Sequence, residues 1–188
     1  MRIVAGKWRG LALVAPDERT TRPSTDRNRE AIASIINSAF DLDLSEVKLL
    51  DAFAGSGAIA FELLSRGAQA ATLVERDRQA LAAIKKNKAQ LRCGAELDLI
   101  SGDVFKLQAE GRFANKQFNL LVLDPPYAYE AALISDFVDK VYEEKALVSG
   151  AFVLYERDAK KPDLDLQNGH CLRDKARGLT ALSLWEMN

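Results

Sequence analysis

The fold class of this chain is decided by one segment, Asp51-Ala52-Phe53-Ala54-Gly55-Ser56-Gly57-Ala58-Ile59-Ala60. Together with Leu49 and Leu50 it predicts a short buried strand over 49–54, followed by a glycine turn and a helix through Ser65. Glycines at such a turn let a ligand approach the backbone without meeting a Cβ atom, and the helix N-terminus favours negative charge. The segment therefore predicts a strand–turn–helix unit that binds a ligand.

Strand and helix patterns alternate from residue 48 onward. Continuous apolar strands separated by helices are typical of a parallel sheet covered by helices on both faces. Around Gly178 the pattern changes, and residues 171–177 and 179–187 predict an antiparallel hairpin. The other predicted strands are 71–75, 97–100, 120–124 and 151–155, and the other predicted helices begin at Thr25 or Asp26, at Asp77 and near Glu130.

Such sheets bind ligands at the carboxyl ends of their strands, so the residues just after each strand are the candidates for a site. Glu75 lies 20 residues after Gly55, the spacing of an acid that accepts ribose hydroxyl groups. Asp103 follows the third strand and could accept a hydrogen bond from an adenine amine, or it could cap a helix. From these residues alone, NAD and other adenosine cofactors remain equally possible. The expected cofactor-binding residues are Asp51, Phe53, Gly55, Gly57, Glu75, Arg76, Asp103, Val104 and Asp124.

The tetrapeptide Asp124-Pro125-Pro126-Tyr127 directly follows the predicted strand over 120–124. Two consecutive prolines end the strand and remove two N–H donors, so the carboxylate and the backbone carbonyls remain as acceptors. Such acceptors suit an exocyclic amine on a planar base, whose nitrogen they would draw toward tetrahedral geometry. Tyr127 would stack on that base. We expect all four residues to be catalytic.

Length and composition bound these interpretations. The chain has 188 residues, 48 % of them apolar, which suits one globular domain and excludes a disordered or collagen-like chain. No apolar run approaches the ~20 residues that span a bilayer, and the N-terminus lacks the apolar core of a secretory signal. Cys93 and Cys171 have no metal-binding spacing, so we expect two buried thiols in a reducing cytoplasm.

The net charge of −1 hides an uneven distribution. Residues 1–29 carry seven cations and three acids, a net +4, whereas the remaining 159 residues carry −5. The first residues also predict a small β-hairpin around Gly6 and Gly10. Local positive charge over an otherwise acidic body is what a protein that docks on a phosphate backbone needs.

Taken together, these motifs resemble the class I S-adenosylmethionine-dependent methyltransferases. The glycine turn, Glu75 and Asp103 are similar to their cofactor motifs, and Asp124–Tyr127 is similar to the (Asp/Asn)-Pro-Pro-(Tyr/Phe) motif of enzymes that methylate base amines. Residues 3–10 and 22–30 narrow the resemblance to the RsmD family of bacterial 16S ribosomal RNA guanine-N2 methyltransferases. Ser24 stands where that family's pattern has Thr, and the C-terminal hairpin is divergent.

The resemblance implies a Rossmann-like, mostly parallel seven-stranded sheet and S-adenosylmethionine as cofactor. It implies methylation of guanine N2 in 16S ribosomal RNA, either naked or in an assembling small subunit. It also implies that residues 1–24 form a basic extension that docks on RNA and that residues 25–188 form the catalytic domain. The RNA-binding residues that it implies are Lys7, Trp8, Arg9, Arg22, Arg27 and Arg29. We expect a cytoplasmic monomer that needs neither metal nor membrane. The alternatives are an adenine-N6 methyltransferase, an NAD-dependent oxidoreductase, and an RNA-binding protein without catalysis.

Overall fold

The computed structural model describes residues 1–16 and 26–188, with side chains from residue 28 onward in the second range. Two compact units make up the chain, residues 1–102 and residues 103–188. The boundary expected near residue 24 lies outside the described residues and stays a prediction.

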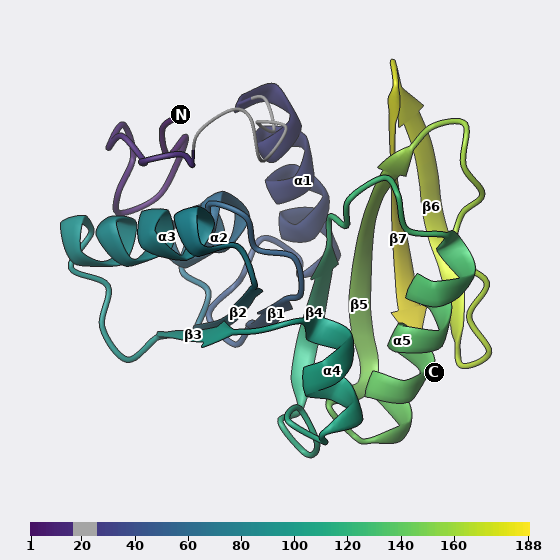
Figure 1. The fold of residues 1–188 in the computed structure, drawn as a ribbon. Helices are drawn as coiled ribbons and strands as arrows, with labels where there is room; N and C mark the ends of the chain where they lie inside the picture. The colour runs from purple at the N-terminus through teal and green to yellow at the C-terminus, as the bar shows by residue number, and fades with distance from the viewer. Residues whose placement is uncertain (17–25) are drawn as a thin grey trace. The chain divides into compact units, whose positions relative to one another are not determined.

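The described residues of unit 1 form three parallel strands and three helices. The strands are β1 (Lys48–Asp51), β2 (Ala70–Glu75) and β3 (Leu97–Ser101), with β2 in the middle. The helices α2 (Ala58–Ser65) and α3 (Arg78–Gln90) lie on one side of these strands in Figure 1, and α1 (Asp26–Ala39) packs against α2. Every residue of α2 is buried, which explains why this short segment is almost wholly apolar.

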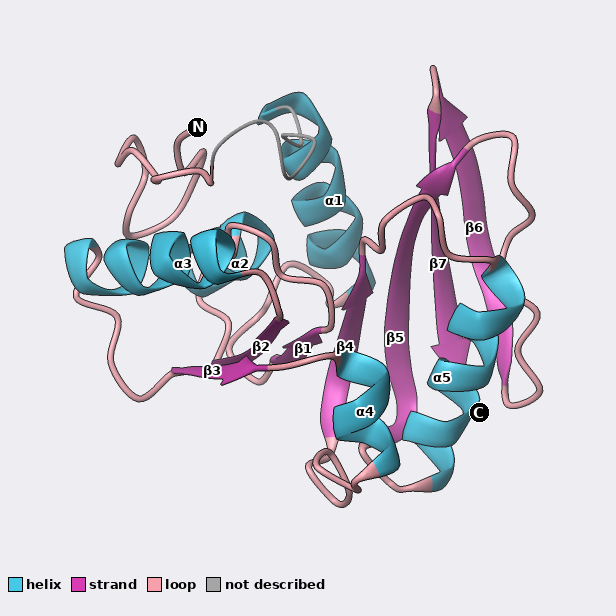
Figure 2. Cartoon of the chain, viewed as in Figure 1, coloured by secondary structure: helices cyan, strands magenta, loops and turns pink. Residues whose placement is uncertain are grey.

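Unit 2 contains the remaining strands and two helices. Its parallel pair, β4 (Phe118–Leu123) and β5 (Leu147–Asp158), continues into the antiparallel strands β7 (Thr180–Met187) and β6 (Gly169–Arg177). The helices are α4 (Val104–Ala109) and α5 (Ala131–Glu143), and both lie on one side of β4 and β5 in Figure 2. Across the described residues, the sheet has seven strands in the order β3-β2-β1-β4-β5-β7-β6. The expected Rossmann-like fold with a C-terminal hairpin is confirmed.

Three elements differ clearly from the sequence prediction. β5 runs over Leu147–Asp158, whereas the predicted strand covered only 151–155. β1 ends at Asp51 rather than at residue 54, because the chain turns there and the amide of Ala54 donates to the carbonyl of Val74. The prediction omitted α4, whose six residues are too few to show helical periodicity.

The N-terminal segment forms a hairpin with a minimal ladder. Its one β-bridge joins Arg2 and Ala12, and the amide of Ile3 donates to the carbonyl of Leu11 at 3.0 Å. The expected pairing is therefore present, although it does not extend into strands. Of the two cysteines, Cys93 is buried but Cys171 is exposed, so the prediction of two buried thiols is wrong for Cys171, which lies on the edge strand β6. Among the described helices, none is long and apolar enough to span a membrane.

Candidate active site

The predicted site residues fall in both units, and unit 1 holds the glycine turn. Gly57 precedes α2 with φ 73°, and a Cβ atom there would lie 3.0 Å from side-chain atoms of Leu73 and Phe61. Gly55 also has a positive φ, but a Cβ atom there would meet no atom within 4 Å. Gly57 is thus needed for packing and conformation, whereas Gly55 faces open space in which a ligand could approach the backbone.

Glu75 closes this turn from the end of β2. Its carboxylate accepts three backbone hydrogen bonds, from the amides of Gly55, Arg76 and Asp77, each at 2.7 Å. Charge-assisted bonds of this length hold the carboxylate in one orientation. Arg76 therefore contacts the carboxylate of Glu75 through its backbone amide.

Asp51 ends β1 and is only 1 % exposed. Burial, and to a smaller extent the charge of Glu75, raise the pKa of its carboxyl group to about 7, although a hydrogen bond from the amide of Phe53 acts to lower it. A cationic group placed beside Asp51 would favour its ionised form. Phe53 itself is half-buried just after it.

Asp103 begins unit 2 as the N-cap of α4. Its Oδ1 atom accepts from the amides of Phe105 at 3.1 Å and Lys106 at 3.3 Å, while Val104 is buried. The helix-cap interpretation of Asp103 is thus confirmed, and its contact with adenine remains a prediction.

The tetrapeptide begins one residue after β4 ends. Pro125 is buried, and Asp124 and Tyr127 are half-buried. The hydroxyl groups of Tyr127 and Thr180 form a hydrogen bond at 3.4 Å. The following turn is closed by the amide of Tyr129, which donates to the carbonyl of Pro126 at 3.0 Å.

Lys161, which the sequence analysis did not single out, braces this turn. Its Nζ atom donates to the carbonyl of Tyr129 and to Glu130 Oε1, both at 3.1 Å. The ring of Tyr129 also contacts Phe105 edge-on at 5.5 Å. No local pattern marks Lys161, because its partners lie about 30 residues earlier in the chain.

The basic N-terminal segment is fastened to α2 through its backbone. The amides of Val4 and Ala5 donate to the carboxylate of Glu62, at 2.7 and 3.1 Å, and the amide of Trp8 donates to Ser65 Oγ at 2.9 Å. Glu62 is 2 % exposed and also accepts from Arg66. The sequence analysis did not predict this role for Glu62 and Ser65. The one signal for it was that both are polar residues in an otherwise apolar helix.

The side chains of this segment differ in availability. Lys7 and Arg9 are exposed, and Lys7 Nζ lies 4.3 Å from the centre of the half-buried Trp8 ring and 3.8 Å from Glu96. Arg29 is 1 % exposed and donates from Nη2 to the carbonyl of Arg2, so its side chain supports the N-terminal segment instead of facing RNA. Arg22 and the side chain of Arg27 lie outside the described residues.

The comparisons with known proteins agree with this assembly of motifs. The family model described as Conserved hypothetical protein 95 matches residues 1–186. A Haemophilus influenzae protein named Ribosomal RNA small subunit methyltransferase D is 30 % identical over 190 residues, covering 99 % of this chain and 93 % of that protein. The chain belongs to the RsmD family.

Solved structures extend the comparison within and beyond the RsmD family. A provisionally named methyltransferase of Escherichia coli, yhhF, superposes with a TM-score of 0.84 at 29 % identity, covering 100 % of this chain and 98 % of the other. An RNA methyltransferase from Salinibacter ruber, in complex with S-adenosyl-L-homocysteine, has a TM-score of 0.61 at 14 % identity, covering 88 % and 93 %. That second likeness concerns the fold alone. Among the described residues of this RsmD-family chain, no cluster of His, Cys, Asp or Glu could hold a metal ion.

Proposed function

We propose that this chain transfers the methyl group of S-adenosylmethionine to the exocyclic N2 amine of a guanine in 16S ribosomal RNA. Membership of the RsmD family and the name of the Haemophilus relative support methylation of ribosomal RNA. The observation that carries the proposal is the tetrapeptide Asp124–Tyr127 at the carboxyl end of β4, which offers acceptors and an aromatic ring. Guanine N2 as the target rests on the family resemblance.

The residues of unit 1 fit the cofactor. Open space beside Gly55 would let a nucleoside approach the backbone, and Glu75, held by three amides, would accept from its ribose hydroxyl groups. Asp51, buried with a pKa raised to about 7, suits the cationic end of the cofactor, which would restore its charge. In unit 2, Asp103 with its neighbour Val104 would contact the adenine. When bound, S-adenosylmethionine supplies an electrophilic methyl group on a positively charged sulfur.

The chain's own work is to position the amine. Asp124 and the adjacent carbonyls accept its N–H groups, which directs the nitrogen lone pair at the methyl group. Tyr127 stacks on the flipped base, and its hydrogen bond with Thr180 fixes the ring. Asp124 takes the proton once methylation has made the amine acidic. Positioning of this kind lowers a barrier by roughly 7–11 kcal/mol.

Two assays test the proposal. Purified protein is incubated with methyl-labelled S-adenosylmethionine and either naked 16S ribosomal RNA or small-subunit particles, and the nucleosides are identified by mass spectrometry. N2-methylguanosine supports the proposal, N6-methyladenosine replaces it with the adenine alternative, and no labelled nucleoside on either substrate contradicts it. Calorimetry with S-adenosylmethionine and with NAD separates the methyltransferase from an oxidoreductase.

A further inference from the structure

We propose that the RNA strand next to the target nucleotide lies along one face of the edge strand β6, on a row of three cations. This inference deepens the proposed function, on which it rests, by assigning the substrate a second docking surface. The cationic row consists of Arg173, Lys175 and Arg177. β6 is exposed along almost its whole length, unlike the other strands of unit 2.

The cationic row follows from strand geometry. Side chains two residues apart on a strand point to the same face, about 7 Å apart. The partners of the three cations on β7 are Leu184, Leu182 and Thr180, so no acid stands opposite any of them. In the part of the chain that the structure describes, no ion pair engages these cations, so their charges are available to an anionic partner.

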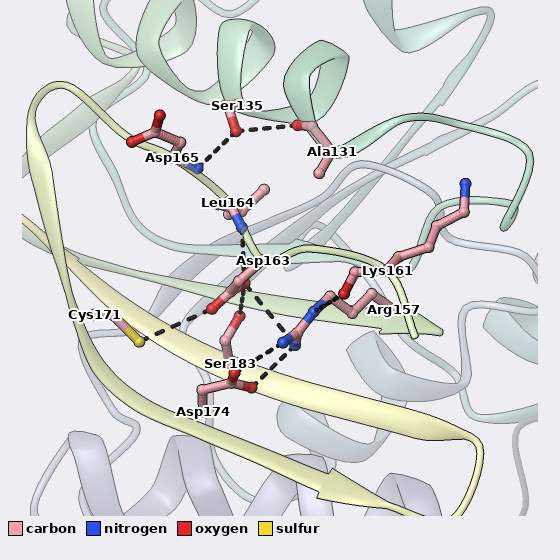
Figure 3. Close-up of polar contacts among 10 residues, drawn as sticks. All are labelled: Ala131, Ser135, Arg157, Lys161, Asp163, Leu164, Asp165, Cys171, Asp174 and Ser183. Carbon is pink, nitrogen blue, oxygen red and sulfur yellow. Dashed lines mark hydrogen bonds and ion pairs between the residues drawn. The ribbon is translucent and has the colours of Figure 1, made fainter. Parts of the chain in front are cut away.

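This hairpin carries two acids, Asp174 and Glu186. Asp174 points to the opposite face of β6, where the buried Arg157 binds both of its oxygens, at 3.0 and 2.8 Å (Figure 3). Arg157 also lies 3.9 Å from Asp163. Glu186 shares a face of β7 with Leu184 and therefore lies on the face of the row, 3.6 Å from His170 at the end away from Arg177. Asp174 is thus compensated on one face of β6, whereas on the other face the three cations outnumber the one acid of the hairpin.

Two further acids share the face of the row, at a distance. Glu156 and Asp158 on β5 stand beyond β7, opposite Leu182 and Thr180. Two strand spacings separate them from the cations, about 10 Å, which is comparable with the Debye length at physiological salt. Glu156 is also buried, so neither acid cancels the field that a phosphate would meet above β6.

The row ends at the catalytic tetrapeptide. Arg177 is the register partner of Thr180, whose hydroxyl group bonds to that of Tyr127. A nucleotide whose base stacks on Tyr127 would therefore have its neighbouring phosphates within reach of the row. This continuity, together with the regular spacing of positive charge, favours an RNA strand as the occupant.

Cations on an edge strand can instead block pairing with a second chain. Under that role, removing the charges raises self-association and leaves RNA affinity unchanged. A variant without these charges therefore separates the two roles. RNA docking predicts weaker RNA binding, whereas the blocking role predicts more self-association with unchanged RNA affinity.

The test uses the full chain with Arg173→Gln, Lys175→Gln and Arg177→Gln combined. Its control combines Arg112→Gln, Lys116→Gln and Lys145→Gln, which remove the same charge from exposed positions before β4 and β5 in the same unit. Binding of fluorescein-labelled 16S ribosomal RNA fragments is measured from 50 to 300 mM salt, with KM for RNA and calorimetric affinity for S-adenosylmethionine. If circular dichroism shows that the triple variant is less folded than the wild type, the single variant Lys175→Gln takes its place in the test.

We expect the row variant to bind RNA roughly 10–100-fold more weakly at 0.1 M salt, with a salt slope smaller by about 2. KM for RNA should rise while affinity for S-adenosylmethionine stays constant. Equal RNA binding by the row and control variants, or increased self-association with unchanged RNA affinity, would overturn the inference. A wild-type protein that binds RNA through the row but methylates nothing would contradict the proposed function alone.

Discussion

The glycine turn after β1 and the proline turn after β4 stand at equivalent positions in their strands but present opposite chemistry. The glycine turn exposes backbone beside Gly55, and its polar partner Glu75 is already held by three amides. The proline turn lacks two N–H donors, so acceptors dominate it. Under the proposed function, the same position in a strand–turn unit would bind the hydroxyl-rich cofactor in one unit and the substrate amine in the other. We therefore expect substitutions at the two turns to separate cofactor binding from catalysis.

The largest effect is expected at the proline turn. Asp124→Asn replaces one acceptor with a donor and removes the proposed base, so kcat should fall by roughly 10²–10⁴-fold. Calorimetric affinity for S-adenosylmethionine should stay within about threefold of wild type. Asp136→Asn, an exposed acid on α5, is the control and should keep full turnover. A large loss of cofactor affinity in Asp124→Asn would break the division between the two turns.

The next effect concerns the pH dependence of stability at the glycine turn. Because the folded protein raises the pKa of Asp51 to about 7, it binds a proton that the unfolded chain releases near pH 4. The free energy of unfolding should therefore fall as the pH rises from 4 to 7, by up to about 4 kcal/mol for this group. Asp51→Asn should remove that decline.

Urea unfolding of both proteins at pH 5 and pH 8 checks this expectation. The difference between the two pH values should be smaller in the variant. Saturating S-adenosylmethionine should also reduce the wild-type decline if its cationic end lies beside Asp51. An identical pH profile for both proteins would show that Asp51 is not the group responsible.

Glu75→Gln sharpens the comparison from the cofactor side. The new amide group meets backbone N–H donors where a carboxylate oxygen accepted them, and the charge-assisted bonds are lost. Affinity for S-adenosylmethionine should fall roughly 10–100-fold, whereas kcat at saturating cofactor should fall less than fivefold. Steady-state kinetics measures both, with the exposed Glu110→Gln as the charge control. A kcat loss as large as that of Asp124→Asn would erase the distinction between the turns.

The smallest effect is expected for Lys161, which bonds to the turn that follows the tetrapeptide. Lys161→Met removes the bond to the carbonyl of Tyr129 and a pair with the exposed Glu130, together worth about 1 kcal/mol. KM for RNA should rise about three- to fivefold with little change in cofactor affinity. Lys160→Met, one residue earlier and exposed, is the matched control. Equal kinetics in the two variants would show that the turn holds its shape without Lys161.

Local signals in the sequence were enough for most of the fold and for the motifs. The alternation of strands and helices, the cap at Asp77 and the hairpin around Gly178 each depend on residues close together in the chain, and the structure confirms them. The glycine turn and the tetrapeptide could be recognised because each is a contiguous segment after a strand. The short helix α4 was not predicted, because six residues are too few to show helical periodicity.

Only the tertiary structure decided which charged groups are engaged. Arg29 resembled an RNA-binding cation in the sequence but is buried beneath the N-terminal segment, which Glu62 fastens from 58 residues away. On β6, Arg157 neutralises Asp174 across 17 residues and leaves the opposite face positive. Sequence order thus determined the fold and the position of each motif. The compensation of each charge depends on strand register and long-range packing, which no local pattern encodes.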